Sequence, residues 1–384
     1  MRFFSVFLIL SLLLCGCAVK TPPETTPPAT AETVPPVTET VPPATEETLP
    51  PNPVEVLLAE MSAEEKVGQL FLARCPESGV WEDIAACHLG GLLLFGRDFE
   101  NQTVQSLTQT LAAYQASADI PLLIATDEEG GSVCRVSAHP AFREKKFSSP
   151  RTLFGKGGME AVLSAESEKA ELLRALGINV NMAPVCDIAT DSDAFMYRRS
   201  LGQEPETVGV FAAETVNILR ENQVGSVLKH FPGYGNNADT HTGFAVDERT
   251  ADALESRDLI PFSMGIEAGC GAILVSHTIV TAFDDALPAS LSPAVHTYLR
   301  QEMGFDGVIV TDDLVMDAIT DSYGAGESAV LAVLAGNDLL CSTQYREQYA
   351  AVLAAVSDGR ISMDALNAAV SHILRWKVDL GLLT

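Results

Sequence analysis

The chain has 384 residues, of which 47% are hydrophobic and 20% charged, so it can bury a sizeable core and is neither a disordered nor a fibrous protein. Acidic residues outnumber basic residues 51 to 24, which gives a net charge of -27. A surface of this sign repels the phosphate backbone. Nucleic acid is therefore excluded as a partner, and neutral or cationic ligands are favoured over polyphosphates.

Residues 1–16 have the features of a secretory signal peptide. Arg2 precedes an apolar run over residues 3–15 that is too short to span a membrane. The run ends in LCGC at residues 14–17, which resembles the bacterial lipobox, and the resemblance implies that Cys17 is lipid-modified and becomes the new N-terminus. We therefore predict an extracytoplasmic lipoprotein, anchored to the outer face of a bacterial cell membrane. The alternative is an ordinary secretory signal cleaved nearby.

Residues 17–53 are expected to be a disordered linker that follows the lipidated cysteine. Residues 21–53 hold 11 of the 21 prolines of the chain, in imperfect Pro-Pro-x-Thr units, and such a segment cannot bury a core. In a polyproline II conformation, at about 3.1 Å per residue, it would span roughly 100 Å. The segment is interpreted as a passive stalk between the membrane and a folded domain.

Residues 54–384 are expected to form one folded domain, whose 331 residues are ordinary for an α/β barrel. Its cysteines show neither CxxC nor CxxH spacing, so no zinc site is indicated. Most lie in or beside apolar runs, where a cysteine is usually a small buried hydrophobe, and a disulfide framework is not expected. The six cysteines are Cys75, Cys87, Cys134, Cys186, Cys270 and Cys341.

Eight short apolar runs alternate with helical stretches along this domain. Ser62 opens a capping box of the form S-x-x-E, which predicts a first helix. The strands are predicted at residues 68–73, 91–95, 121–126, 179–185, 225–229, 272–276, 307–311 and 338–341. Helices are predicted at residues 160–176, 206–221, 251–267, 292–303 and 326–335. Strands that are apolar on both faces and alternate with helices predict a parallel sheet, and eight repeats favour a single TIM-like (β/α)8 barrel.

Polar side chains follow six of the predicted strands. They are Arg97 and Asp98, Asp127, Asp187, Lys229 and His230, Ser276 and His277, and Asp312 and Asp313. A single such residue is usually a charge that reaches water. Because the active sites of these barrels lie at the carboxyl ends of the strands, six polar strand ends together predict a functional site.

Five short motifs occur in a fixed order. They are TDEEGGSVCR at residues 126–135, RSLG at 199–202, KHFPGYG at 229–235, DTH at 239–241 and TDDLVM at 311–316. Together they resemble glycoside hydrolase family 3, in its single-domain β-N-acetylhexosaminidase branch. The resemblance extends from Glu64 to the end of the chain. Relatives with β-glucosidase activity generally take their acid/base carboxylate from a second domain, so the single barrel expected here and the DTH loop favour the same branch.

The resemblance implies a retaining exo-β-N-acetylglucosaminidase without a metal or cofactor. It assigns Asp312 as the nucleophile that forms a covalent glycosyl-enzyme, and His241 as the general acid/base. Asp239 would orient the imidazole and favour its protonated form. Since histidine titrates near pH 6.5, it can donate a proton to the leaving oxygen and later accept one from water. Most glycosidases use two carboxylates for these steps, so the histidine is a departure from the usual pairing.

The resemblance also implies which residues bind the hydroxyl groups of the terminal N-acetylglucosamine. They are Asp127, Arg135, Arg199, Lys229 and His230. Strand-end ion pairs are the alternative, which fits Arg135 taken alone but fits the adjacent Lys229 and His230 poorly. His277 either lines the pocket or supports it from behind.

Two departures from the family pattern lie close together. Tyr234 stands where many relatives have a second histidine, and residues 191–197 replace a stretch that is richer in Asn and Pro in relatives. These departures predict an unusual leaving-group side. Glu128, in place of a frequent Gln, is a mild change.

Other protein classes stay open at this point. A lipid-anchored solute-binding protein would need no nucleophile, but it should show two lobes instead of eight strand-helix units. A cell-wall-binding family member without catalysis is opposed only by the presence of Asp312 and His241. A metal-dependent hydrolase is disfavoured because the first strand carries no H-x-H. We expect a monomer that acts on cell-wall fragments, with chitooligosaccharides or glycoprotein glycans as alternatives.

Overall fold

Eight parallel strands form a barrel in the computed structural model, which describes residues 52–237, 245–316, 319 and 322–383. The barrel strands are β1 (Phe71–Arg74), β2 (Gly91–Leu94), β3 (Leu123–Thr126), β6 (Val180–Asn181), β7 (Gly225–Phe231), β9 (Ala272–Val275), β11 (Val308–Thr311) and β12 (Leu340–Ser342). Each falls within or overlaps one of the eight apolar runs predicted from the sequence.

The strands pair in the order β11-β9-β7-β6-β3-β2-β1-β12, and every pairing is parallel. One parallel bridge between Val310 and Leu339 joins β11 to the start of β12. Backbone hydrogen bonds support this seam, from Thr311 N to Leu339 O (3.1 Å) and from Leu339 N to Ile309 O (3.1 Å). The single bridge brings the two ends of the sheet together, so the eight strands form a nearly closed parallel barrel. This α/β architecture is consistent with the TIM-like fold predicted from the sequence.

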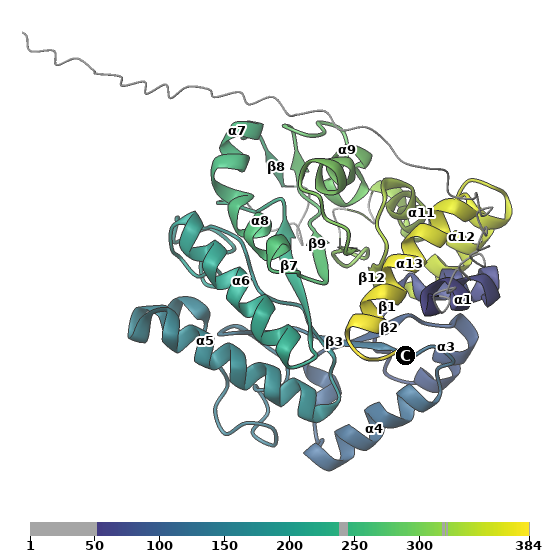
Figure 1. Cartoon of the computed structure of the whole chain (residues 1–384), viewed down its shortest axis with the longest axis horizontal. Coiled ribbons are helices and arrows are strands. Elements are labelled where there is room, and N and C mark those ends of the chain that lie inside the picture. The colour runs from purple at the N-terminus through teal and green to yellow at the C-terminus, as the bar shows by residue number, and fades with distance from the viewer. Residues whose placement is uncertain (1–51, 238–244, 317–318, 320–321, 384) are drawn as a thin grey trace, which may run out of the picture. The chain divides into compact units, whose positions relative to one another are not determined.

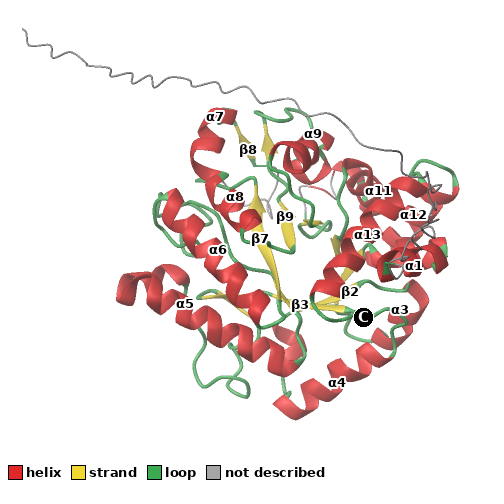
Figure 2. Cartoon of the chain, viewed as in Figure 1, coloured by secondary structure: helices red, strands yellow, loops and turns green. Residues whose placement is uncertain are grey.

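Helices surround the strands (Figures 1 and 2). They are α1 (Pro53–Glu60), α2 (Ala63–Gln69), α3 (Val80–Cys87), α4 (Val104–Ala116), α5 (Pro150–Leu176), α6 (Pro205–Glu221), α7 (Ala251–Ala253), α8 (Ile260–Glu267), α9 (Pro293–Thr297), α11 (Ala325–Ala335), α12 (Tyr345–Ser357) and α13 (Met363–Asp379). The described residues also contain short 3-10 segments, η1 (Gly96–Phe99) and η4 (Ala289–Leu291), and π-helical segments, η3 (Leu254–Asp258) and η5 (Tyr298–Glu302). Two small sheets, β4 (Glu128–Gly130) with β5 (Val133–Cys134) and β8 (Val246–Asp247) with β10 (Ile279–Val280), lie in the connections.

Local sequence signals start and stop these helices as expected. Ser62 and Glu65 form a reciprocal capping box at α2. Pro205 stands in the first turn of α6, and the Ser292 hydroxyl accepts the backbone N–H of Val295 at the start of α9. Gly177 ends α5 in the left-handed conformation, at φ 85°.

The core fills the barrel and the space between strands and helices. The buried cysteines behave as small apolar side chains, because all six in the described residues are free thiols. At the amino-terminal end of the barrel, the Trp376 ring of α13 packs against Gly225 and Gly271, where a Cβ atom would lie 2.6 and 2.0 Å from its atoms. Glycine is required at both positions, so α13 closes this end.

Three predicted helices need correction. The helix predicted from residue 160 starts ten residues earlier, at Pro150, and is kinked at Gly157 and Gly158, which have non-helical backbone angles. The helix predicted over residues 251–267 is three segments, α7, η3 and α8, and the helix predicted over residues 292–303 is two, α9 and η5. No helix in the described residues is long and apolar enough to cross a membrane. The predicted signal peptide, Cys17 and nearly all of the linker lie outside the described residues.

Candidate active site

A cavity of about 660 Å³, here called the central cavity, lies at the carboxyl ends of the barrel strands. Each of the eight strands, or the loop that follows it, contributes lining residues. The titratable ones are Arg74, Asp127, Glu129, Arg135, Arg198, Arg199, Lys229, His230, Asp312, Asp313 and Cys341. The cavity thus lies where barrel enzymes hold their active sites.

Lys229 and Glu129 form the buried centre of a charged network on the cavity wall. The Lys229 Nζ atom lies 2.8 Å from Asp127 Oδ1 and 2.7 Å from Glu129 Oε1. Arg199 donates two hydrogen bonds to the same Glu129 carboxylate, from Nε (2.9 Å) and Nη2 (2.7 Å). Glu129 therefore joins Lys229 of β7 to Arg199, which lies in the connection after β6.

The pKa shifts of Glu129 and Lys229 favour the charged form of each group. Burial opposes the charge on Glu129, but the neighbouring Lys229 and Arg199 outweigh it and hold the pKa of this carboxyl well below its usual range. Burial likewise opposes the charge on Lys229, and the carboxylates of Asp127 and Glu129 raise its pKa above its usual value. At neutral pH the wall presents fixed charges whose remaining hydrogen-bonding capacity can serve a polar ligand.

His230 is held by a buried carboxylate behind it. Its Nδ1 atom lies 2.7 Å from Asp187 Oδ2, and Asp187 also accepts the backbone N–H groups of His230 (3.2 Å) and Tyr234 (2.7 Å). The Nε2 atom is 3.3 Å from Arg199 Nη2. This arrangement suits a tautomer whose Nδ1–H donates to Asp187, which fixes the ring orientation. The peptide bond between Lys229 and His230 is cis.

Asp312 and Asp313 follow β11 and also line the cavity. Asp312 is half-buried, and its carboxylate Oδ1 accepts the backbone N–H of Asp313 (2.9 Å). Asp313 accepts hydrogen bonds from the backbone N–H (3.1 Å) and hydroxyl (2.6 Å) of Thr343, in the loop after β12. Burial raises the pKa of Asp313 above its usual value. Asp313 thus ties the loop that carries Asp312 to the neighbouring strand end.

His277 supports this loop from behind and does not line the cavity. Its side chain is fully buried, with Nδ1 at 2.7 Å from Ser290 Oγ and Nε2 at 3.1 Å from the backbone oxygen of Asp313. Of the two roles that the sequence allowed for His277, the supporting one is confirmed.

The loop after β3 brings Arg135 to the cavity. Its Nη2 atom lies 3.5 Å from Asp127 Oδ2, and its guanidinium lies over the Phe95 ring at 5.1 Å from the centroid. The buried Glu128 carboxylate shapes this loop by accepting the backbone N–H groups of Arg135 (3.0 Å) and Val136 (2.8 Å). Glu128 is therefore structural, although its neighbours face the cavity.

The structure gathers six of the residues predicted from the sequence around one cavity. They are Asp127, Arg135, Arg199, Lys229, His230 and Asp312. The predicted His241 and Asp239 lie outside the described residues. Sequence reasoning missed Glu129 and the supporting role of Asp187. Both are acidic residues near predicted strand ends. Only the fold shows that Glu129 binds Lys229 and Arg199 and that Asp187 binds the His230 imidazole.

The departure at Tyr234 is a buried packing residue. Its side chain is 1% exposed, and its ring meets the His230 ring edge-on, with centroids 5.3 Å apart. Phe195, from the altered stretch 191–197, lines the cavity and packs against Tyr234 at 6.0 Å. Aromatic contacts behind His230 therefore connect the two departures noted in the sequence.

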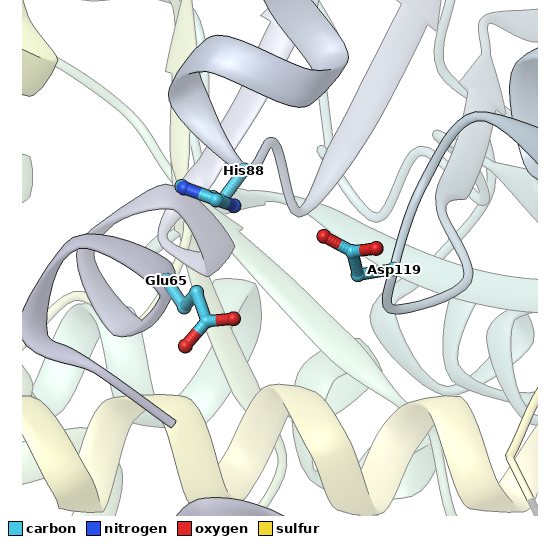
Figure 3. A group of neighbouring side chains, drawn as sticks. All are labelled: Glu65, His88 and Asp119. Atoms are coloured by element: carbon cyan, nitrogen blue, oxygen red, sulfur yellow. The ribbon is translucent and has the colours of Figure 1, made fainter. Parts of the chain in front are cut away.

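A different group of titratable side chains, shown in Figure 3, does not line the central cavity; it consists of Glu65, His88 and Asp119. These residues precede β1, β2 and β3, so they belong to the amino-terminal end of the barrel. Their ligand atoms all lie within 4.8 Å of one another, and Asp119 is exposed. Glu65 already accepts the backbone N–H of Ser62 as part of the helix cap. We assign no function to this group.

Comparisons with known proteins agree on one family. A family model described as the glycosyl hydrolase family 3 N terminal domain matches residues 62–376. The beta-hexosaminidase of Stenotrophomonas maltophilia K279a is 33% identical over 308 residues, which cover 74% of this chain and 89% of that protein.

Solved structures give the same result. A glycoside hydrolase family 3 beta-N-acetylglucosaminidase from Paenibacillus sp. FPU-7 matches with a TM-score of 0.79 and 34% identity, over 84% of this chain and 63% of that protein. M. tuberculosis LpqI matches with a TM-score of 0.77 and 28% identity, over 85% of this chain and 96% of LpqI. The chain therefore spans just under two thirds of the Paenibacillus protein and nearly all of LpqI.

Proposed function

The chain belongs to glycosyl hydrolase family 3, and from this membership we propose that it is an exo-acting β-N-acetylglucosaminidase that removes a terminal, non-reducing N-acetylglucosamine residue. The observation that carries the proposal is the central cavity, which is lined both by the charged network around Lys229 and by Asp312. The names of the S. maltophilia and Paenibacillus relatives support the choice of sugar.

The charged wall suits recognition of hydroxyl groups. A sugar hydroxyl both donates and accepts, so it can bridge the Asp127 carboxylate and the Lys229 ammonium, which lie 2.8 Å apart. Hydrogen bonds to charged groups are stronger than neutral ones and lose strength quickly when the geometry is wrong. Buried Glu129 holds Lys229 in place, and buried Asp187 holds His230 in place, before the sugar arrives. A preformed wall lowers the ordering cost of binding.

In the proposed reaction Asp312 attacks the anomeric carbon while His241 protonates the leaving oxygen, which breaks the glycosidic bond and leaves a covalent glycosyl-enzyme. His241 then takes a proton from water, the water attacks the same carbon, and the Asp312 carboxylate is released. Two displacements at one carbon retain the anomeric configuration. Asp239 would orient His241. The roles of His241 and Asp239 rest on the DTH motif alone.

The proposed setting is the outer face of a bacterial membrane, with Cys17 as the lipid anchor and residues 21–53 as the stalk. Cell-wall fragments with terminal N-acetylglucosamine linked to N-acetylmuramic acid are the proposed natural substrates. This part of the proposal rests on the LCGC segment and on the Pro/Thr-rich composition. No observation favours a non-catalytic binding protein over the enzyme.

Parallel assays on nitrophenyl glycosides test the proposal. The domain from Val54 onward should hydrolyse the β-N-acetylglucosaminide far faster than the β-glucoside, with the β-N-acetylgalactosaminide as a third substrate. Activity should persist without added metal and in the presence of a chelator. A preference for the glucoside, or loss of activity with the chelator, would contradict the proposal.

A further inference from the structure

Three neighbouring cavities lead from the centre of the barrel end to an exposed tryptophan. The central cavity shares Arg74 with a second cavity of about 310 Å³, here called the bridging cavity, above the ends of β1 and β12. The bridging cavity shares Pro76, Glu77, Ser78 and Arg97 with a third cavity of about 330 Å³, here called the outer cavity. The three cavities are therefore neighbours along this edge of the barrel end, with Arg74 between the central and the bridging cavity.

Trp81 stands in the wall of the outer cavity, in the first turn of α3. Its side chain is 49% exposed, and it is the one aromatic residue among the exposed large hydrophobic side chains of the described chain. Its ring packs edge-on against Tyr114 of α4, with centroids 5.1 Å apart and planes inclined at 65°. This contact holds the indole in place while much of its surface remains open to solvent. An exposed, oriented aromatic ring beside a cavity is a binding feature.

Polar groups of the outer cavity are fixed around the ring. Arg97 donates to Glu77 Oε1 (2.9 Å) and to the backbone oxygen of Cys75. Asp98 Oδ2 accepts the backbone N–H of Phe95 (2.7 Å), and Gln102 also lines the cavity. A few convergent polar groups beside an aromatic surface are typical of small-molecule pockets. A pyranose ring combines an apolar C–H face with a rim of hydroxyl groups, so it matches both parts of this wall.

We propose that the outer cavity is a distal glycan subsite, in which Trp81 stacks on a sugar ring beyond the one next to the scissile bond. This inference rests on the proposed function and deepens it. An exo-acting enzyme places only the terminal sugar in the central cavity, so any sugar farther along the path belongs to the leaving group. The preferred substrates are then oligomeric or polymeric glycans, and a disaccharide leaves the outer cavity empty.

Kinetics of the Trp81→Ala variant test this subsite. Turnover of the aryl β-N-acetylglucosaminide and of chitobiose should stay within about twofold of wild type, which also shows that the variant folds. The KM for chitopentaose should rise about tenfold, as expected for the loss of one stacking contact. The matched control is Val210→Ala, which shortens an exposed apolar side chain on α6 and should change none of these values. An equal effect of Trp81→Ala on short and long substrates would overturn the subsite.

A binding experiment separates this inference from the proposed activity. The chain has two tryptophans, and the second, Trp376, is buried at the opposite end of the barrel. Fluorescence of the inactive Asp312→Asn variant therefore reports mainly on Trp81. Addition of chitopentaose should change the emission saturably and protect it from quenching by iodide, whereas chitobiose should not. If the wild type hydrolyses none of the substrates but the variant shows this fluorescence response, the proposed activity is wrong and the subsite is still supported. An unchanged emission spectrum of the variant overturns the subsite.

Discussion

At the scale of single residues, Glu129 is the counter-charge that allows Lys229 and Arg199 to stay buried side by side. Glu129→Gln removes this charge but keeps the shape, which leaves two cations in a poorly solvated wall. We expect the free energy of unfolding to fall by about 3 kcal/mol, because one partner of a buried ion pair is lost. Urea denaturation at neutral pH measures this loss, and kcat/KM should also fall as the wall loses its order.

The pH dependence of the stability loss in Glu129→Gln shows whether that loss is electrostatic. The pKa of Glu129 is lower in the folded protein than its usual value of about 4.5, so its ionisation stabilises the fold above that pH, and this contribution is lost as pH falls through the folded-state pKa. The wild type and Glu129→Gln should therefore converge in stability on acidification below about pH 4.5. The control is Glu168→Gln, which breaks an exposed pair with Arg143 and should cost less than about 1 kcal/mol. A gap that stays constant with pH would rule out an electrostatic cause.

The division of labour between Asp312 and His241 is testable by leaving-group dependence. Asp312→Ala should abolish turnover of all substrates, because no glycosyl-enzyme can form. His241→Ala should slow natural disaccharides by roughly 10²- to 10⁴-fold in the glycosylation step, since a sugar alkoxide needs a proton. A nitrophenolate leaves without a proton, so glycosylation by that substrate should suffer much less. Steady-state and burst kinetics with both substrates measure the difference.

Azide and product stereochemistry complete this test. Azide attacks the intermediate without base assistance, so it should partly restore turnover of the nitrophenyl substrate by His241→Ala and yield a β-glycosyl azide. The wild type should release the β-anomer first, as NMR of fresh product can show. An inverted product, or equal defects for good and poor leaving groups, would mean that these roles are wrongly assigned.

The sequence predicted the residues that line the cavity better than it predicted the buried residues that hold them in position. Lys229, Arg199 and Asp312 were found because they stand in recognisable motifs at strand ends. Glu129 lies only two residues from Asp127, yet its link to Arg199 joins residues 70 positions apart, which no local pattern encodes. Asp187 and His277 were visible as polar strand ends, but their burial behind the wall depends on how neighbouring strands pack.

At the scale of elements, helix α13 carries a charge that burial disfavours. Lys377 is fully buried, its Nζ donates to Gln69 Oε1 (2.6 Å), and burial lowers its pKa to about 7. The unfolded chain binds this proton up to about pH 10.4, so the charge destabilises the fold fully below pH 7, and the effect fades between these two values. Lys377→Met should therefore raise the free energy of unfolding by about 3 kcal/mol at pH 6 and by little at pH 10.

Thermal or urea unfolding across this pH range measures the Lys377 effect. Lys146→Met is the matched control, since it removes an exposed lysine and the same net charge. The control should show a small change without this pH profile. Destabilisation of Lys377→Met at pH 6 would show that the hydrogen bond to Gln69 outweighs the burial of the charge.

The strands were predictable because they are buried on both faces and therefore read as apolar runs, such as residues 272–276. The start of α5 was not, because the pattern before residue 160 is interrupted by Gly157 and Gly158, which read as a loop. The π-helical η3 and η5 were invisible for a different reason. Their apolar residues recur at nearly the spacing of an α-helix. The hydrophobic pattern therefore predicts one continuous helix, although the backbone hydrogen bonds change from the α-helical to the π-helical type.

At the scale of the whole molecule, the predicted anchor and the barrel should be separable. Cys17→Ser should release the protein from the membrane into the medium without altering turnover, because the Pro/Thr-rich segment lies between Cys17 and the barrel. Fractionation of cells followed by the aryl glycoside assay measures both properties. Retention in the membrane fraction would count against the lipobox interpretation of residues 14–17.

The seam between β11 and β12 links the chemistry to completion of the polypeptide. During synthesis, a nascent chain that has emerged as far as residue 320 already contains every residue assigned to the reaction. It still lacks Leu339, which joins the seam, and Thr343, which binds the Asp313 carboxylate next to Asp312. The Asp312 loop therefore gains this support only after β12 and the residue that follows it have been synthesised. The last strand of the barrel thus contributes to the site through its backbone and its following loop, although it carries no side chain to which a step of the proposed reaction is assigned.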